Sequence, residues 1–449
     1  MDVNASSRPG VAVVGGGLTG LVAADRLLAA GFPVTVFEKY REAGGLVGTF
    51  EAGGGRLECF YHHLFTSDVD FVSLAQDLNL GGELEWLSPR MGFYSGGKIY
   101  PFGTPASLLS FSPLGVVGRL QFVLSTLKLR GHADWRELEG ETAAGWFRKN
   151  GFGKAFDVVW APLLHQKYGR RAEEVSLVWL WGKIALRSRS RNRSGLGESL
   201  GYMRGSFGRV VDALLARIRE RGGVFFPGRP VRLVRTSGGG FSVETPAGSA
   251  AFPRVLSTVA IPELLRLVPE LPEETRTLWS RIEYGHALCP VLELDRPLSR
   301  FYWTNVGELD MPFGGVIEHT NYIPKERYGG RHVVYVSDYV LPDDPKWRMK
   351  DDDLWALYTP GLERFSPEFV KAKVLARRIF RAEYAQPIVP PHYSRIVPGL
   401  QTPLEGLYSA AMAQIYPEDR GQNYAVRMGR AAADAIASDS AGDGSQART

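Results

Sequence analysis

Cysteine is scarce in this sequence: its 449 residues include two, Cys59 and Cys289, which lie far apart. No CxxC motif occurs, which argues against a dithiol redox centre and against a structural zinc site. We therefore expect no metal. This cysteine usage fits a reducing compartment, and we expect a cytoplasmic protein.

Long apolar runs are also missing. No uninterrupted stretch reaches the roughly 18 apolar residues that suggest a membrane span. The first ten residues are polar and lack the basic and apolar regions of a signal peptide. At the other end, residues 441–449 are small and polar, and we predict that they form a disordered tail.

Positive charge is only slightly in excess, since the formal net charge is +5 over the whole chain. That bias is much weaker than in typical nucleic-acid binders, so no nucleic-acid partner is expected. It favours instead an anionic or phosphate-bearing small-molecule substrate, or an anionic membrane surface.

What the sequence does contain begins with a strand and a glycine-rich loop. Residues 11–14 are uniformly apolar, which predicts a buried parallel strand, and the loop occupies residues 15–20. Residues 18–30 then carry apolar side chains at helical spacing. Residues 34–37 predict a second buried strand, which ends at Glu38. These elements form one βαβ unit.

The loop has the features of a dinucleotide-binding site. A helix N-terminus offers unpaired N–H groups and a positive dipole end to a pyrophosphate. Gly15 permits a tight turn, Gly17 lets the backbone approach the phosphates, and Gly20 lets helix and strand pack closely. Glu38 follows Gly15 by 23 residues and can accept hydrogen bonds from the adenosine ribose. The loop alone does not distinguish NAD from FAD.

The next residues resemble a known flavoprotein motif. Gly44-Gly45 and Thr49 are similar to the second glycine motif of the flavin-containing amine oxidase superfamily, which includes monoamine oxidase, protoporphyrinogen oxidase, phytoene desaturase and UDP-galactopyranose mutase. In that superfamily this loop lies along the pyrophosphate and ribityl chain of FAD. The strand, loop and helix near the C-terminus resemble its flavin-capping element. By this resemblance, residues 421–423 face the flavin pyrimidine ring.

The resemblance implies FAD as the cofactor and suggests its contacts. Val231 resembles the position whose backbone touches adenine. The family strand usually ends in Gly-Asp, but this chain has Ala410-Ala411-Met412 there, and Asp419 is the candidate substitute for the acid. The predicted cofactor-binding residues are Gly15, Gly17, Leu18, Thr19, Gly20, Glu38, Lys39, Gly44, Gly45, Thr49, Val231, Arg420, Gln422 and Asn423.

The fold class that we predict is α/β. It has a discontinuous Rossmann-like FAD-binding domain of the glutathione-reductase type and an inserted α+β substrate domain. The FAD-binding domain is assigned to residues 1–56, 200–260 and 384–440, and the substrate-binding domain to residues 57–199 and 261–383. No second GxGxxG motif follows a strand, so a dedicated NAD(P) domain is not expected.

Two short segments carry candidate catalytic residues. His62 and His63 resemble a histidine-containing segment beside the isoalloxazine in the mutase branch, where a histidine could move protons or hydrogen-bond flavin N5. Lys167 and Tyr168 lie in a segment similar to one that approaches the active site in the family, and could polarise a substrate or hold a water. The alternative for the histidines is a packing or indirect supporting role, and the alternative for the second pair is a surface lysine and a core tyrosine.

Basic and apolar segments suggest contacts with other molecules. Residues 187–193 alternate arginine with small polar residues, which predicts a loop. This loop is either simply solvated or binds substrate phosphate groups through Arg189 and Arg191. Tyr416 is a further substrate-binding candidate. Residues 114–130 predict a helix with an apolar face and basic flanks, which serves either core packing or peripheral membrane contact.

Two functions fit these observations. The leading hypothesis is an FAD-dependent oxidoreductase that dehydrogenates or desaturates a small molecule by hydride transfer to flavin N5. The alternative is a redox-neutral mutase acting on a nucleotide sugar, similar to UDP-galactopyranose mutase, which the histidine pair and the arginine-rich segment favour. Against the alternative, the tyrosine-rich C-terminal motif of the mutases is not reproduced.

Overall fold

The computed structural model describes residues 8–189 and 199–446. Arg191 lies outside the described residues. Arg189 is described only as the last residue of a helix. Within the described ranges, no helix is both long and apolar enough to cross a bilayer.

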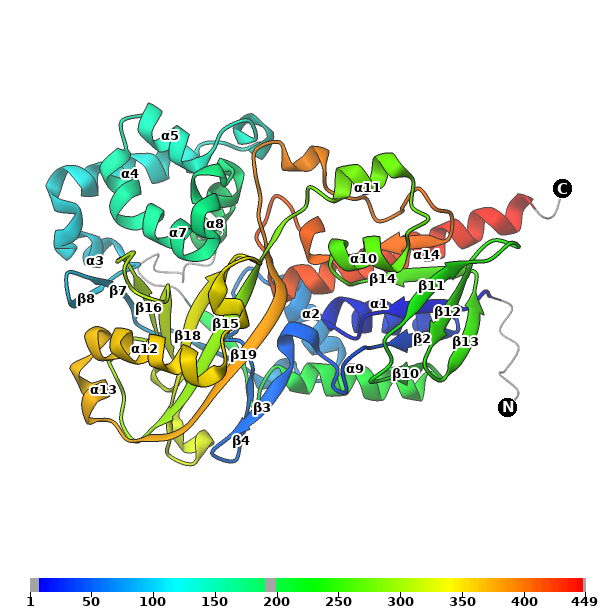
Figure 1. Ribbon diagram of the computed structural model, residues 1–449, viewed down its shortest axis with the longest axis horizontal. Helices are drawn as coiled ribbons and strands as arrows, with labels where there is room; N and C mark the ends of the chain where they lie inside the picture. The colour runs from blue at the N-terminus through cyan, green and yellow to red at the C-terminus, as the bar shows by residue number, and fades with distance from the viewer. Residues whose placement is uncertain (1–7, 190–198, 447–449) are drawn as a thin grey trace.

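A five-stranded parallel sheet forms the nucleotide-binding part of the molecule (Figure 1). Its strand order is β10-β2-β1-β14-β20, and every neighbouring pair is parallel. The central strand β1 is fully buried, as its apolar sequence predicts. The strands span Val11–Val14 (β1), Val34–Phe37 (β2), Val224–Phe226 (β10), Arg254–Ser257 (β14) and Leu407–Ser409 (β20).

The two faces of this sheet are covered differently, and β1 contributes to both because its side chains alternate. Val11 and Val13 belong to the apolar core under the helices α1, α9 and α14. Ala12 and Val14 belong to a second core shared with the antiparallel sheet β11-β12-β13. These elements span Leu18–Ala29 (α1), Gly208–Glu220 (α9), Gln422–Gln446 (α14), Arg232–Arg235 (β11), Phe241–Thr245 (β12) and Gly248–Phe252 (β13).

A second large sheet has seven strands in the order β19-β15-β18-β17-β16-β7-β8. Its neighbours are antiparallel except β16 and β7. Strand β15 is buried along its whole length, and α12 and α13 cover part of the sheet in Figure 1. The elements span Met91–Ser95 (β7), Lys98–Pro101 (β8), Tyr284–Leu294 (β15), Trp303–Val306 (β16), Gly315–Glu318 (β17), His332–Val340 (β18), Val374–Pro387 (β19), Asp351–Phe365 (α12) and Pro367–Lys371 (α13).

A layer of helices lies beyond one end of the seven-stranded sheet, at the upper left of Figure 1. It contains α3 (Pro105–Ser110), α4 (Gly115–Arg130), α5 (Ala143–Lys149), α6 (Gly153–Ala155), a π-helical turn (Phe156–Trp160), α7 (Ala161–Tyr168) and α8 (Leu177–Arg189). The remaining elements are β3 (Thr49–Ala52), β4 (Gly55–Glu58), β5 (Leu64–Phe65), α2 (Val69–Asp77), β6 (Leu84–Leu87), β9 (Leu200–Met203), α10 (Ile261–Leu267) and α11 (Glu273–Trp279).

Two local expectations were wrong. Helix α14 continues to Gln446, so the chain is helical where we expected disorder from residue 441. Helix α8 continues to Arg189, so residues 187–189 are not a loop. In both cases an established helix adds hydrogen bonds without a new nucleation cost. Pro253 separates β13 from β14, because proline cannot donate to the ladder.

Candidate functional site

The glycine loop has the geometry that dinucleotide binding requires. Gly15 has a φ of +114°, which favours glycine strongly. A Cβ on Gly20 would overlap the carbonyl oxygen of Gly15, so only glycine allows α1 to approach the loop this closely. A Cβ on Gly17 would meet no atom within 4 Å, so this glycine borders open space at the start of α1. Leu18 and Thr19 form the first turn of that helix.

Glu38 stabilises this loop through a hydrogen bond to its backbone. Its carboxylate accepts hydrogen bonds from the backbone N–H of Gly16 at 2.7 Å and of Tyr40 at 2.8 Å. The side chain is buried at the carboxyl end of the sheet. Two carboxylate oxygens offer about four acceptor positions, so these bonds leave room for ribose hydroxyls. The acid therefore has a structural role as well as the binding role expected from its position.

The second glycine motif meets the first. Gly44 pairs with Gly17 in an isolated parallel bridge, and its N–H donates to the carbonyl of Gly16 at 2.8 Å. Both Gly44 and Gly45 have positive φ. A Cβ on Gly45 would lie 3.3 Å from the Cα of Gly17. The two motifs thus form one continuous backbone surface beside the N-terminus of α1.

Three other predicted cofactor residues lie around this surface. Thr49 begins β3, and its hydroxyl accepts a hydrogen bond from Arg56 at 2.8 Å. The ammonium of Lys39 lies 4.9 Å from the centre of the Tyr40 ring. Val231 precedes β11 and packs against the core beneath that sheet.

The flavin end of the predicted site begins at the N-terminus of α14. Asn423 is buried, and its side-chain oxygen accepts the N–H of Phe71 at 3.0 Å, which ties α14 to α2. Gln422 is also buried, but neither polar atom of its amide has a hydrogen-bond partner among the described residues. An unpaired buried amide is costly. The polar edge of a flavin ring would satisfy it, so the residues present fit the cofactor.

A buried charge cluster lies just before this helix. Asp419 accepts hydrogen bonds from Trp179 Nε1 at 3.1 Å and Gln386 Nε2 at 3.2 Å. Its carboxylate also lies 2.5 Å from Lys183 Nζ and 3.6 Å from Lys167 Nζ. Burial alone would raise the pKa of this carboxyl, but the two lysines hold it well below its ordinary value. Asp419 is thus the counter-ion of Lys167 and Lys183. It is not a free carboxylate that could replace the aspartate that the family has at the position of Met412.

Lys167 has an unusual environment. Its side chain is 12% exposed, and its ammonium lies over the rings of Trp179 and Tyr339. Burial lowers the pKa of Lys167 well below its usual range. Asp419 opposes this shift, while Lys183 and Arg420 add to it. A lowered pKa increases the fraction of neutral amine at a given pH, and a neutral amine accepts protons.

Arg420 links the charges to a row of hydroxyl groups. Its Nε donates to the Gln386 side chain at 2.8 Å, and its Nη2 donates to the Tyr339 hydroxyl at 2.5 Å. The Tyr339 hydroxyl lies 3.4 Å from that of Tyr61, which in turn lies 2.6 Å from Ser337 Oγ. We call Lys167, Lys183, Tyr339, Asp419 and Arg420 the Asp419 cluster.

The predicted catalytic residues divide between two environments. Nδ1 of His62 lies 2.6 Å from the Phe60 carbonyl and must donate to it. Burial lowers the pKa of His62 to about 4, and nearby Arg420 adds to the shift, so the ring is neutral at pH 7. His63 is 3.1 Å from the Tyr302 hydroxyl and has edge contacts with Phe65 and Trp303. The charge of Arg420 therefore acts on His62, while His63 packs among aromatic side chains.

Tyr168 and Tyr416 also lie in two different environments, one in the interior and one at the surface. Tyr168 is buried against Trp179, and its hydroxyl has no hydrogen-bond partner among the described residues. Tyr416 instead lines a surface hollow of about 460 Å³ and donates to Glu139 at 3.0 Å. The hydrogen bond and ring contacts of Tyr416 join it to Glu139, Trp135 and Tyr393, none of which belongs to the Asp419 cluster.

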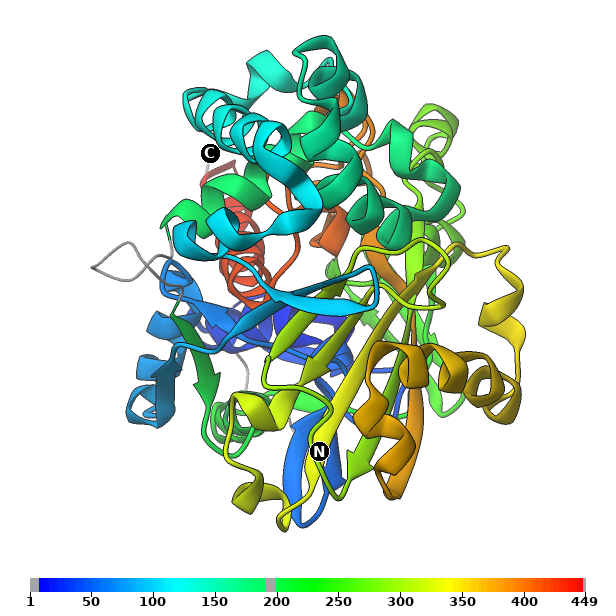
Figure 2. The ribbon, with the colours of Figure 1, turned by 90° about the vertical axis from the view of Figure 1, so that its left-hand side faces the viewer.

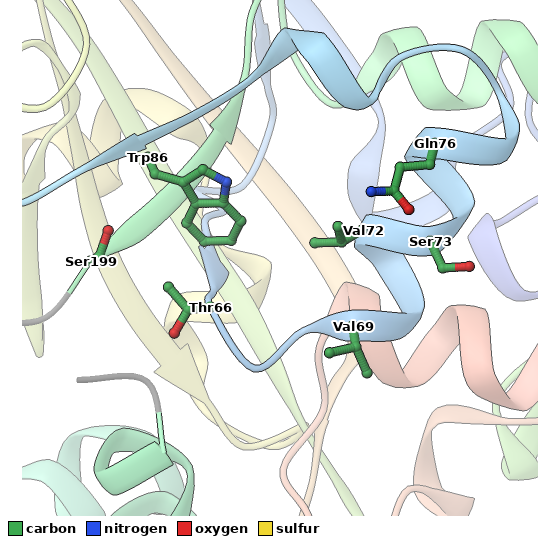
Figure 3. A pocket seen from close by; sticks show the side chains of 7 residues that line it. All are labelled: Thr66, Val69, Val72, Ser73, Gln76, Trp86 and Ser199. Carbon is green, nitrogen blue, oxygen red and sulfur yellow. The ribbon is translucent and has the colours of Figure 1, made fainter. Parts of the chain in front are cut away.

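A separate open hollow of about 580 Å³ lies between α2 and strand β6 (Figure 3). Among the described residues, no titratable side chain lines it, so the described lining offers no group for proton transfer. None of the described predicted site residues lies in it either. Its lining consists of Thr66, Val69, Val72, Ser73, Gln76, Trp86 and Ser199.

Sequence reasoning missed Gln386 and Lys183. Gln386 comes from β19, where nothing in its local pattern distinguishes it from other strand residues. Lys183 did carry a signal, because it is the only charged residue in the segment Trp179–Leu186. A lone lysine in such a helix needs an acidic partner when the helix is covered.

Comparison with known proteins agrees with this geometry. Residues 18–437 match the family described as flavin containing amine oxidoreductase. The chain belongs to this family. It is accordingly a flavin-dependent oxidoreductase, and its cofactor is FAD.

Relatives of the family share the fold at low sequence identity. A candidate protoporphyrinogen oxidase from Exiguobacterium sp. 255-15 superposes with a TM-score of 0.76 at 17% identity, covering 96% of this chain and 99% of that one. A reduced UDP-galactopyranose mutase gives a TM-score of 0.73 at 17% identity over 96% and 95%. A probable zeta-carotene desaturase from Synechococcus elongatus is 29% identical over 181 residues, which cover 34% of this chain and 37% of that protein. The fold class that we predicted is therefore confirmed.

Proposed function

We propose that this protein dehydrogenates a small-molecule substrate, with Lys167 accepting the proton that leaves with the hydride. The observation that supports this most is the depressed pKa of Lys167, which burial lowers well below its usual range. A neutral amine held beside a carboxylate and a cation is a competent general base. Bound FAD supplies the hydride acceptor.

The Asp419 cluster holds this base in position. Lys167 is fixed between the Asp419 carboxylate and the faces of Trp179 and Tyr339. Lys183 forms the closer ion pair with Asp419, which leaves Lys167 less bound to the carboxylate. Arg420 is held by Gln386 and Tyr339 and keeps a positive charge beside the amine. Each of these contacts limits the motion of Lys167 or disfavours its protonation.

An anionic substrate fits the charge balance. With Lys167 neutral, the two cations Lys183 and Arg420 still face the single carboxylate of Asp419, so the Asp419 cluster has more cations than anions. A buried excess of positive charge is stabilised by a bound anion. His62 adds an acceptor rather than a charge. Its Nδ1 donates to Phe60, so Nε2 is left as the unprotonated nitrogen of the neutral ring.

Anaerobic mixing of the oxidised holoenzyme with candidate substrates tests the proposal. Anionic amines, alcohols and unsaturated compounds should be tried, and loss of the oxidised flavin absorbance should be followed in time. We expect bleaching whose rate rises with pH and reaches a plateau above the pKa of Lys167, because the protonated amine accepts no proton. A substrate that bleaches the flavin at a rate independent of pH and of Lys167 would contradict this assignment.

A second candidate is the redox-neutral rearrangement of a nucleotide sugar. The excess of cations in the Asp419 cluster supports it, because such a substrate carries a diphosphate. This reaction would need a reduced enzyme and consume no electron acceptor. Product formation only after prior reduction of the flavin, with no bleaching of the oxidised form, would favour it over dehydrogenation.

We also propose that the protein is cytoplasmic. Cys59 and Cys289 are both free thiols, which suits a reducing compartment.

Burial raises the pKa of Cys59 to about 12, so it is not a reactive thiolate that could attach the flavin covalently.

A further inference from the structure

The outward face of α4 is apolar along its whole length. Positions 116, 117, 120, 123, 124 and 127 follow the spacing of a single helical face. All six side chains are exposed, by 41% to 80%. Leu109 of α3, which is 74% exposed, lies close to α4 because Arg119 donates to its carbonyl. The apolar stripe consists of Leu109, Val116, Val117, Leu120, Val123, Leu124 and Leu127.

The inner face of the same helix combines small, polar and apolar residues. Gly118, Ser125 and Leu129 are buried, and Phe122 stacks on Trp160. The side chain of Gln121 faces α6 and accepts the N–H of Ala155 at 3.3 Å. A surface helix normally places its apolar residues inward. Core packing, one of the two roles considered for residues 114–130, therefore does not account for the leucines and valines of the stripe.

All the charged residues in the sequence segment that carries the stripe are basic. From Ser88 to Ala133 the sequence contains five lysines and arginines and no aspartate or glutamate. Lys128 and Arg130 are exposed in the last turn of α4. Figure 1 places α3 and α4 at the outer edge of the helical layer, and this edge faces the viewer in Figure 2. The stripe is thus an outer apolar surface with a basic border.

We propose that the apolar stripe docks onto the surface of an anionic lipid bilayer, with α4 lying in the plane of the interface. The helix has 16 residues and is about 24 Å long, which suits lying in the interface rather than crossing the bilayer. Apolar side chains would enter the acyl boundary, and the basic border would meet lipid phosphates. A second copy of this chain fits less well, because it would bring the same basic residues together.

Vesicle flotation of the holoenzyme tests this proposal. Vesicles of phosphatidylcholine alone should be compared with vesicles that also contain phosphatidylglycerol. We expect binding to the anionic vesicles, which weakens as salt is raised because the basic border is screened. The double variant L120S/L124S should bind at least about tenfold more weakly, because two exposed leucines no longer enter the lipid. The variant K128A/R130A should lose the preference for anionic lipid.

A matched control removes exposed apolar side chains elsewhere. Leu309 and Val370 are 60% and 69% exposed, so L309S/V370S changes a similar apolar surface outside α3 and α4. We expect this control to bind vesicles as the unchanged protein does, and all variants to retain bound FAD. Absence of vesicle binding, or equal binding by L120S/L124S, would overturn the proposal. A dimer that L120S/L124S dissociates, without vesicle binding, would overturn it in favour of a second copy.

Discussion

At the adenosine end of the cofactor site, the contacts come from two neighbouring stretches of backbone, the glycine loop and the segment from Glu38 to Gly45. At the flavin end, Lys167, Tyr339 and Asp419 come from segments up to 252 residues apart. The first end depends on backbone conformations that only glycine adopts without strain. The second depends on side-chain charges that burial makes unusual. Damage to the two ends should therefore have different consequences.

The largest effect is expected at Gly20. A side chain there would overlap the Gly15 carbonyl, so G20V should force α1 away from β1 and remove the phosphate-binding geometry. We expect protein without bound FAD and with a lower melting temperature, measured by flavin absorbance per chain and by circular dichroism. A G20V protein with full flavin content would show that the close approach of α1 is unnecessary.

At the flavin end, K167Q should leave the cofactor bound but slow its reduction by substrate. Loss of a general base typically costs about 10²- to 10⁴-fold in rate. Stopped-flow absorbance gives this rate directly, and the pH dependence of reduction should disappear with the lysine. The control is K149Q, because Lys149 is a surface lysine with 71% exposure. Equal rates for K167Q and K149Q would exclude Lys167 as the base.

His62, at the flavin end, should make the stability of the protein depend on pH. Its pKa of about 4 in the folded protein lies below the ordinary value of 6.5, so the unfolded chain binds more protons between these values. The free energy of unfolding should therefore fall as pH drops from 6.5 to 4, by on the order of 3 kcal/mol from this group. Denaturant unfolding of H62Q should lack this part of the pH dependence. Parallel pH profiles for H62Q and the unchanged protein would contradict the assignment.

The smallest effect is expected at Gly17. Because a Cβ there meets no protein atom, G17A should keep the melting temperature of the apoprotein. If the open space receives the pyrophosphate, the methyl group should weaken FAD binding by roughly tenfold. Titration of the apoprotein with FAD measures this, and G82A is the control, since Gly82 also borders open space. Unchanged affinity in G17A would place the pyrophosphate elsewhere.

The strand, glycine loop and helix at the adenosine end could be predicted because their determinants are local. The alternation of strand, glycine loop and helix is visible over residues 11–37, and Glu38 follows directly. Gln386 could not be predicted, because strand pairing in the seven-stranded sheet, rather than a local motif, brings it to Asp419. The orientation of α4 could not be predicted either. Its periodicity identifies two faces, but only the tertiary structure decides which one is covered.

The packing of α14 on α1 has a consequence for biosynthesis. Gly429 lies against the Thr19 carbonyl, and Asp434 pairs with Arg26 at 2.5 Å, so the last helix covers the helix that follows the glycine loop. During translation, α1 leaves the ribosome long before this cover exists. We expect nascent chains that end before residue 407 to remain sensitive to protease around α1, even with excess FAD. Protection of such stalled chains would show that the N-terminal unit folds without its C-terminal partner.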